Sequence, residues 1–130
     1  MITRLSCFFP AGYFSSLKFS ELPLSDQTQK AVAGLGFQKA TEIQARSIPH
    51  ILNGRDVLGA AKTGSGKTLA YMVPAVEMLR RAHFTPKQGT GVLIITPTRE
   101  LAMHNYKWAQ DCLQYHGKTH GVVIGGAKRS

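Results

Sequence analysis

The chain has four stretches in which apolar residues recur every three to four positions, the spacing of one face of an α-helix. Leu69 and Val73 show this spacing in the third stretch. Residues typical of helix ends flank the stretches, because Ser25 and Thr41 are favoured N-terminal caps and Gly36 suits the end of the first helix. We therefore predict helices over 25–35, 41–52, 67–81 and 99–115.

Three short runs of Val, Ile, Leu and small residues alternate with the later helices. They cover 56–60, 92–96 and 121–124. Because strands that alternate with helices are typical of a parallel sheet covered by helices, the pattern predicts an α/β fold. Parallel strands end at one edge of the sheet, where ligands bind, so the segments that leave these runs should form one composite site. Those segments are 61–68, 97–99 and 125–126.

The segment between the first predicted strand and the third helix has the composition of a phosphate-binding loop. Gly64 and Gly66 allow a curled backbone whose N–H groups point at one place. Lys67 adds a positive charge there, and Thr68 offers a hydroxyl for Mg²⁺. Ala61 departs from the strict pattern, which has glycine, and the alternative is a flexible connection with a solvated lysine. We predict a nucleotide-phosphate site formed by Ala61, Lys62, Thr63, Gly64, Ser65, Gly66, Lys67 and Thr68.

Two further segments leave predicted strands. Thr98 is a natural N-cap, and the simpler interpretation of 97–99 is a turn from strand to helix. That interpretation leaves Arg99 unexplained, because a cation in the first helical turn opposes the helix dipole, and a bound phosphate would resolve the conflict. The Gly125-Gly126 pair permits close backbone approach to a ligand, although a plain loop is the favoured interpretation of the pair alone.

A further candidate segment contains Gln44. Thr41 and Gln44 have the spacing of a capping box, in which side chain and backbone satisfy each other at a helix start. A glutamine amide also reads adenine at two atoms, but spacing alone favours the capping box. Upstream, Phe19 is either a base-stacking residue or a core anchor.

Composition narrows the function classes. The chain has 130 residues, which suits one domain, and a net charge of +9, which favours a polyanionic partner such as nucleic acid. Cys7 and Cys112 show no disulfide or zinc spacing, which indicates a reducing, intracellular compartment. No apolar run is long enough to cross a membrane, so we expect no membrane association. Residues 1–18 read as a disordered leader.

Together these segments resemble the DEAD-box RNA helicase family. The loop 61–68, the segment 97–102 (Pro-Thr-Arg-Glu-Leu-Ala), the pair at 125–126 and the segment 36–44 are similar to the family's P-loop, motif Ia, glycine doublet and Q motif, in the family's order. The resemblance covers residues 19–130. The residues in and around these motifs are most similar to those of the nucleolar subgroup that acts in ribosome biogenesis.

The resemblance implies a RecA-like domain that uses ATP and Mg²⁺ to unwind RNA duplexes locally. It implies that Lys67 and Thr68 serve catalysis at the phosphates, with Thr68 holding Mg²⁺, and that Gln44 reads adenine while Phe19 stacks on it. It also implies nucleolar localisation, ribosome-assembly partners and a monomer. Sequence-tolerant contacts to the RNA backbone are implied for Pro97, Thr98, Arg99, Gly125 and Gly126.

The sequence also departs from the family pattern. It contains no Asp-Glu-Ala-Asp, no Ser-Ala-Thr motif and no second RecA-like domain. We therefore expect residues 19–130 to be an incomplete first RecA-like domain that ends after its third strand, with the apolar segment 92–95 lacking a strand to pair with. We expect these 130 residues alone to be inactive. The alternative function is a nucleotide- and RNA-binding module without turnover, and a small P-loop kinase explains the motifs less well.

Overall fold

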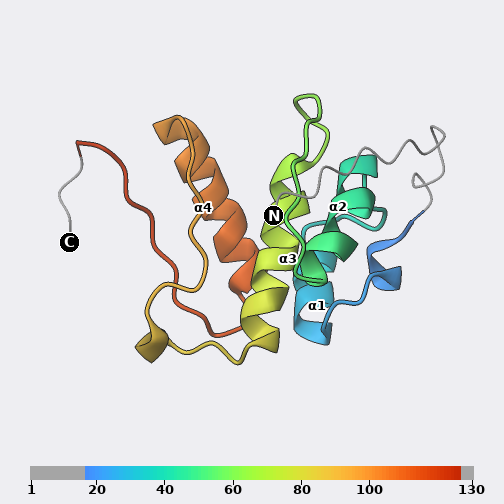
Figure 1. The fold of residues 1–130 in the computed structure, drawn as a ribbon, viewed down its shortest axis with the longest axis horizontal. Coiled ribbons are helices and arrows are strands. Elements are labelled where there is room, and N and C mark those ends of the chain that lie inside the picture. The colour runs from blue at the N-terminus through green and yellow to red at the C-terminus, as the bar shows by residue number, and fades with distance from the viewer. Residues whose placement is uncertain (1–16, 127–130) are drawn as a thin grey trace.

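The computed structural model describes residues 17–126, which form a layer of helices crossed by long unpaired segments (Figure 1). All four predicted helices are confirmed, and the last ends two residues earlier than expected. The predicted leader lies almost entirely outside the described residues. The elements are η1 (Phe19–Glu21), α1 (Asp26–Gly34), α2 (Glu42–Leu52), α3 (Lys67–Arg81), η2 (Pro86–Gln88) and α4 (Arg99–Leu113).

Helix boundaries follow the capping residues that the sequence indicated. The Ser25 Oγ accepts a hydrogen bond from the Thr28 N–H at 3.4 Å and starts α1. The Thr98 Oγ1 accepts one from the Leu101 N–H at 3.2 Å and starts α4. Gly36 follows α1 with a φ of 85°, a left-handed conformation that costs glycine little.

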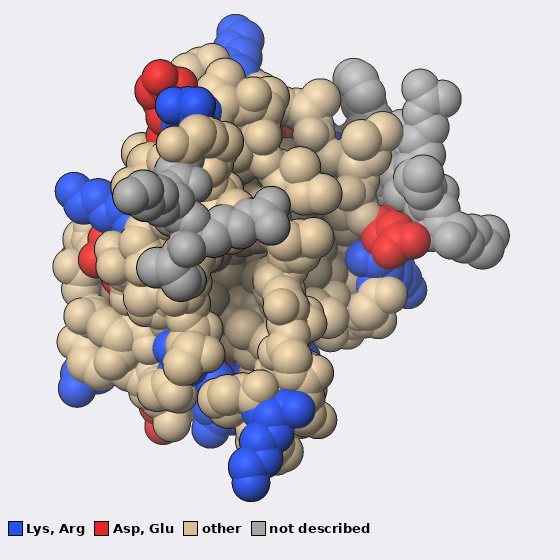
Figure 2. All heavy atoms as spheres, turned by 90° about the vertical axis from the view of Figure 1, so that its left-hand side faces the viewer, with Lys and Arg blue, Asp and Glu red and all other residues tan. Residues whose placement is uncertain are grey.

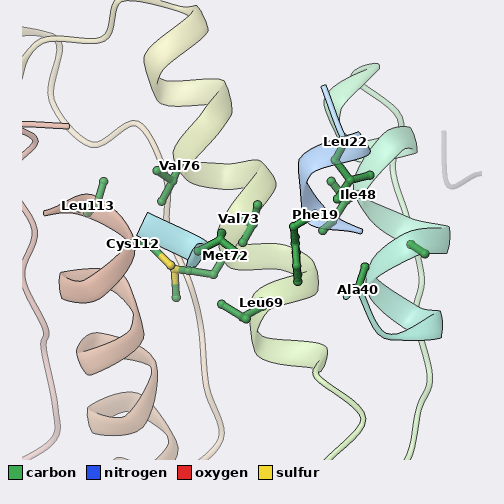
Figure 3. Packing of buried hydrophobic residues seen from close by; sticks show 12 residues of the cluster. Phe19, Leu22, Ala40, Ile48, Leu69, Met72, Val73, Val76, Cys112 and Leu113 are labelled. Atoms are coloured by element: carbon green, nitrogen blue, oxygen red, sulfur yellow. The ribbon is translucent and has the colours of Figure 1, made fainter. Parts of the chain in front are cut away.

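The hydrophobic core is centred on α3, which packs between α2 and α4 (Figures 1 and 3). From α3, Met72 and Val76 lie toward α4, where they meet Cys112 and Leu113 (Figure 3). On the other side, Phe19 of η1 and Ile48 of α2 reach into the same core. Burial raises the pKa of the Cys112 thiol to about 12, so this cysteine is an inert core residue.

The three predicted strands are not paired in the described part of the chain. Within residues 17–126 the one β-bridge joins Lys18 and Lys39, and 56–60, 92–96 and 121–124 take part in no ladder. The prediction of strands here was wrong as stated, since an apolar run favours an extended backbone but a ladder needs a neighbouring strand. Chain order does not say which strands are neighbours. The result agrees with the expectation that 92–95 finds no strand to pair with.

An apolar surface results from these unpaired segments. The Ile95 side chain is 85% exposed and Val123 80% exposed. Together with α3 and α4, residues 92–96 and 121–123 line an apolar groove of about 740 Å³. Figure 2 shows the face that carries α4 and the chain after it, where uncharged side chains fill the middle and charged ones lie at the margin.

A buried carboxylate joins α1 to α3. Glu77 is 2% exposed, and its two oxygens accept hydrogen bonds from the Ser25 N–H at 3.1 Å, the Ser25 Oγ at 2.8 Å and the Thr28 Oγ1 at 2.7 Å. The Arg81 Nε lies 3.5 Å from the carboxylate. Burial by itself raises the pKa of Glu77, but these hydrogen bonds and the Arg81 charge outweigh it, so the pKa lies below its ordinary value of 4.5.

Glu77→Gln should lower the free energy of unfolding by about 1–3 kcal/mol, because an amide keeps the shape but loses the charge and one acceptor. A lowered pKa stabilises the fold fully above the ordinary value and loses this contribution as pH falls through the folded-state value. Wild type should therefore lose stability on acidification below about pH 4.5 more steeply than the variant. Urea unfolding at several pH values measures both effects. Glu42→Gln, at a side chain 59% exposed, is the control and should change little.

Candidate nucleotide and RNA site

The predicted phosphate-binding loop adopts a curled backbone directly before α3. Gly64 has a φ of 81° and Gly66 a φ of 87°, conformations that residues with a Cβ rarely adopt. Gly66 is the N-cap of α3, so Lys67 is its first helical residue and Thr68 its second. The loop therefore aims the N-terminal end of α3 at whatever binds there.

The start of α3 differs from that of the other α-helices in the described residues. Side-chain oxygens accept hydrogen bonds from backbone N–H groups at the starts of α1, α2 and α4, but none does so at the start of α3. Its first N–H groups therefore lack protein partners, and the positive end of the helix dipole lies at the same place. The Ser65 Oγ is also buried without a hydrogen-bond partner. Unmatched donors beside the exposed Lys67 fit a bound phosphate.

Gln44 lies against this loop. Its Oε1 accepts a hydrogen bond from the Thr41 N–H at 2.9 Å, which confirms the predicted capping box. Its Nε2 donates to the Gly66 carbonyl at 3.0 Å. A Cβ at Gly66 would lie 2.5 Å from that Nε2 and 2.9 Å from the Thr41 Oγ1, so the contact requires glycine. The segment 36–44 is thus joined directly to the phosphate-binding loop.

The capping box and adenine recognition are compatible at Gln44. A glutamine amide has two acceptor lone pairs and two N–H donors. The Thr41 N–H occupies one lone pair of Oε1, and the Gly66 carbonyl takes one N–H of Nε2. One acceptor lone pair and one N–H donor of Gln44 remain. Adenine recognition by a glutamine needs one of each, for N6 and N7. The number of hydrogen bonds therefore allows both roles, but Gln44 is 3% exposed, so the contacts in this arrangement are those of the capping box and the Gly66 carbonyl.

Gln44→Ala should reduce the preference for ATP over GTP, because guanine presents a reversed donor and acceptor at that edge. A bidentate contact discriminates by about 1–3 kcal/mol. Gln44→Glu is the matched variant, since it keeps the oxygen that caps the Thr41 N–H but has no N–H for a base. Nucleotide competition should show lost selectivity in both variants, and thermal melts should show lost stability mainly in Gln44→Ala. Selectivity that both variants retain would leave Gln44 with the structural role alone.

The structure does not support base stacking by Phe19. The ring is 2% exposed and belongs to the hydrophobic core beside Leu22 and Ile48 (Figure 3). Its backbone is also fixed, since the Phe19 N–H donates to the Gln38 carbonyl at 3.0 Å. A base cannot reach a ring that is covered by apolar side chains, so the core-anchor interpretation is correct for this arrangement.

The second and third candidate segments meet through Arg99. A Cβ at Gly126 would lie 2.8 Å from the Arg99 Nη2, and one at Gly125 3.8 Å from it. Gly126 also has a φ of 77°. The glycine pair thus leaves room for the guanidinium at the first residue of α4. Pro97 and Thr98 are exposed just before it.

These segments lie at the same end of the helical layer. α3 and α4 pack together and run in the same direction, so that both begin at the top of Figure 1. The phosphate-binding loop precedes α3 there, and the segment 97–99 precedes α4. The sequence prediction of one composite edge therefore agrees with the structure, although no paired sheet holds the segments within residues 17–126.

Comparisons with known proteins agree with this geometry. The family model of the DEAD/DEAH box helicases matches residues 41–130. The chain belongs to the DEAD/DEAH box helicase family. It is 54% identical over 127 residues to the ATP-dependent RNA helicase has-1 of Neurospora crassa, covering 98% of this chain and 22% of that protein. It is 60% identical over 112 residues to the ATP-dependent RNA helicase has1 of Schizosaccharomyces pombe, covering 86% and 19%.

Solved DEAD-box structures confirm the fold class. The RNA helicase Prp28 from Chaetomium thermophilum, solved bound to ADP, is 32% identical, has a TM-score of 0.76, and is matched over 85% of this chain and 27% of that one. A DEAD box protein from Methanococcus jannaschii is also 32% identical, with a TM-score of 0.70 and coverage of 86% and 30%. The chain thus has the RecA-like α/β fold and spans about a fifth of the curated relatives' length.

Sequence reasoning missed one contact of this candidate site. Thr41 was assigned only to the helix start, yet its side chain lies beside Gly66 of the phosphate-binding loop. The signal was present, because Thr41 and Gln44 occur together in the segment similar to the Q motif. Among the described helices, none is long and apolar enough to cross a membrane.

Proposed function

We propose that the whole protein is an ATP-dependent RNA helicase, which couples ATP binding and hydrolysis to local unwinding of RNA duplexes. The observation that carries the proposal is the composite edge. There the uncapped start of α3 contacts Gln44, and Arg99 lies against Gly126. A P-loop joined to a base-reading glutamine fits ATP, and a neighbouring arginine with exposed glycine amides fits a nucleic-acid backbone.

The loop residues would bind the nucleotide in this proposal. The amides of 61–66 and the first turn of α3 would surround the phosphates, the Lys67 ammonium would pair with them, and the Thr68 hydroxyl would hold Mg²⁺. A metal ion held there would supply positive charge against the phosphates. Gln44 keeps the loop attached to α2 through Gly66 and offers its remaining donor and acceptor to adenine.

Arg99 is proposed to bind the RNA backbone together with Pro97, Thr98, Gly125 and Gly126. An arginine fork and free backbone N–H groups recognise phosphates without reading bases, so binding should tolerate any sequence. The net charge of +9 supports a polyanionic partner.

Arg99→Ala should weaken binding to every single-stranded RNA tested by a similar factor. Loss of one phosphate contact should reduce the slope of log affinity against log salt by about 0.7. Fluorescence anisotropy with two unrelated homopolymers at four salt concentrations measures both quantities. Lys87→Ala, an exposed lysine away from this edge, is the control. A strong preference for one homopolymer, or no dependence on salt, would contradict the assignment.

A second candidate function applies to the 130 residues by themselves, namely a nucleotide- and RNA-binding module without turnover. All seven acidic residues of the chain lie in the described part. Glu77 is buried and accepts hydrogen bonds from Ser25 and Thr28 at the start of α1, Glu42 pairs with Arg46, and Glu100 lies in the first turn of α4. None belongs to an Asp-Glu-Ala-Asp motif, so the residues that hold Mg²⁺ and orient water in the family have no counterpart here.

The place of action is proposed from the resemblance to the nucleolar subgroup. We place the protein in the nucleolus, as a monomer acting with ribosome-assembly proteins. Fluorescent tagging of the full-length protein and its sedimentation with precursor ribosomal particles test this part. Exclusion from the nucleolus would refute the placement without affecting the assignment of the ATP site.

The activity itself is tested on the full-length protein with a short RNA duplex. Strand separation and phosphate release are measured together, with ATP, with GTP and without nucleotide. The proposal requires RNA-stimulated hydrolysis of ATP and strand separation that depends on ATP. ATP and RNA binding without either activity would favour the non-catalytic alternative.

A further inference from the structure

A shallow basic hollow lies at the end of α3 that is remote from the phosphate-binding loop. α3 has 15 residues, so the two ends are separated by roughly 22 Å along its axis. The hollow has a volume of about 320 Å³. Four of its six lining residues are basic and none is acidic. They are Gln27, Arg80, His83, Tyr115, His116 and Lys118.

The Arg80-Arg81 doublet divides into two roles at this hollow. The Arg81 Nη2 donates to the Pro23 carbonyl at 2.6 Å, and its Nε lies 3.5 Å from the Glu77 carboxylate, so Arg81 is structural. The Arg80 Nε donates at 2.9 Å to the Gln27 Oε1, which is uncharged. Within residues 17–126 no carboxylate pairs with Arg80. Its positive charge is therefore not neutralised by the described protein.

Lys118 and His116 add to the same charge. The Lys118 ammonium donates to the Phe84 carbonyl, again an uncharged acceptor. Burial lowers the pKa of His116, Glu77 opposes this effect, and the charges of Arg80 and Lys118 lower it further. Three positively charged or protonatable groups thus lie close enough to repel one another, and a bound anion would remove that repulsion.

The hydrogen bonds determine which nitrogen of His116 is available. The Thr28 Oγ1 donates its proton to the Glu77 Oε2 at 2.7 Å. The same oxygen lies 3.1 Å from the His116 Nε2, so it must accept there and Nε2 must carry the proton. Nδ1 is left free. A second proton at Nδ1 would make it a charged donor, and a bound anion would favour that proton.

His83 also has an unusual backbone in this hollow. It follows α3 with a φ of 48°, a conformation that glycine usually occupies at a helix end. Strained residues of this kind concentrate at binding sites. The simpler explanation is that basic side chains complement the negative end of the helix dipole. That explanation accounts for each base singly but not for their convergence on one hollow that no acidic residue lines.

We propose that this hollow binds a phosphate group of an RNA strand, as a second contact beyond the composite edge. An arginine fork matches the oxygens of a phosphate, and Lys118 and His116 add donors beside it. The proposal rests on the proposed RNA binding, because RNA is the polyanion that the family acts on. An RNA long enough to pass from the composite edge to the far end of α3 would use both sites, and a short RNA only the first.

The test uses the full-length protein with a saturating ATP analogue, so that the phosphate-binding loop is filled. Anisotropy measures affinity for single-stranded RNAs of about 8 and about 30 nucleotides. Arg80→Gln combined with Lys118→Gln should weaken binding of the long RNA about tenfold and leave the short RNA unchanged, since bonds to charged groups are strong. Lys87→Gln combined with Lys107→Gln removes the same charge from exposed positions outside the hollow and should leave the difference between the two RNAs intact.

If the double variant weakens binding of both RNAs equally, or of neither, the proposal is overturned. If wild type does not bind the short RNA at all, the proposed function itself is refuted. Thermal melts with tripolyphosphate form a second arm. One outcome is that tripolyphosphate raises the melting temperature of wild type but not of the double variant, while both bind RNA equally well. That result would overturn RNA as the source of the phosphate and indicate a small polyphosphate. If the double variant does not fold, Arg80→Gln alone decides, because its one described hydrogen bond is to Gln27.

Discussion

Lys67→Ala in the full-length protein should abolish measurable ATP hydrolysis. Lys67 is the first residue of a helix whose N-terminal donors have no side-chain cap, so it places a positive charge at the end of α3 where we propose that the phosphates bind. Removing one preorganised donor from a site of charge development costs about 10²–10³ in rate. The γ-phosphate would also lose its main charge contact in the ground state, so ATP affinity should fall as well.

Steady-state phosphate release and nucleotide binding measure the two effects of Lys67→Ala separately. Lys87→Ala is the matched control, because it removes an exposed lysine from η2 and should keep normal turnover. A thermal melt shows that the variant is folded, since Lys67 is exposed and makes no core contact. Near-normal turnover by a folded Lys67→Ala protein would disprove the assignment of the loop.

The 130 residues expressed alone should not hydrolyse ATP at a useful rate. Phosphoryl transfer depends on a metal-holding acid, a residue that orients water and an arginine finger worth about 10³–10⁵ in rate. None of the seven acids of this chain belongs to an Asp-Glu-Ala-Asp motif, and Glu77 is buried among hydroxyl groups. The exposed apolar segments around Ile95 and Val123 should also make the isolated chain prone to association.

Phosphate release by the purified 130 residues, with and without RNA, tests this second expectation. The full-length protein under the same conditions provides the reference rate. A thermal melt and light scattering report folding and association. RNA-stimulated turnover at rates like those of the full-length protein, abolished by Lys67→Ala, would show that the catalytic groups are already present in these residues.

The local features of this protein were predictable because they depend on neighbours in the chain. The helix starts at Ser25 and Thr98 follow from side chains that bond to N–H groups three residues on. The curled backbone at 61–68 was predictable because glycine adopts positive φ angles readily. Gly64 and Gly66 do adopt such angles. The composite edge was also predictable, since it depends only on the alternation of apolar runs and helices.

Contacts between distant segments were decided by the tertiary structure. An aromatic residue serves equally well in a core or on a base, and only packing against Ile48 assigns Phe19 to the core. Strand pairing depends on a neighbour rather than on the apolar run itself, so 92–96 and 121–124 remain unpaired in the described chain.

The sequence by itself determined the helices, the family and the curled loop 61–68 that we propose to bind phosphate, because each depends on residue types at short and regular spacing. The tertiary structure alone decided how side chains with several possible partners are used. It assigned Gln44 to Gly66, 22 positions away, and placed Arg99 on Gly126. It also separated Arg81, which pairs with Glu77, from Arg80, which pairs with no acid among residues 17–126. The physical reason is that hydrogen bonds and charge pairing depend on distance in space, which chain separation does not encode.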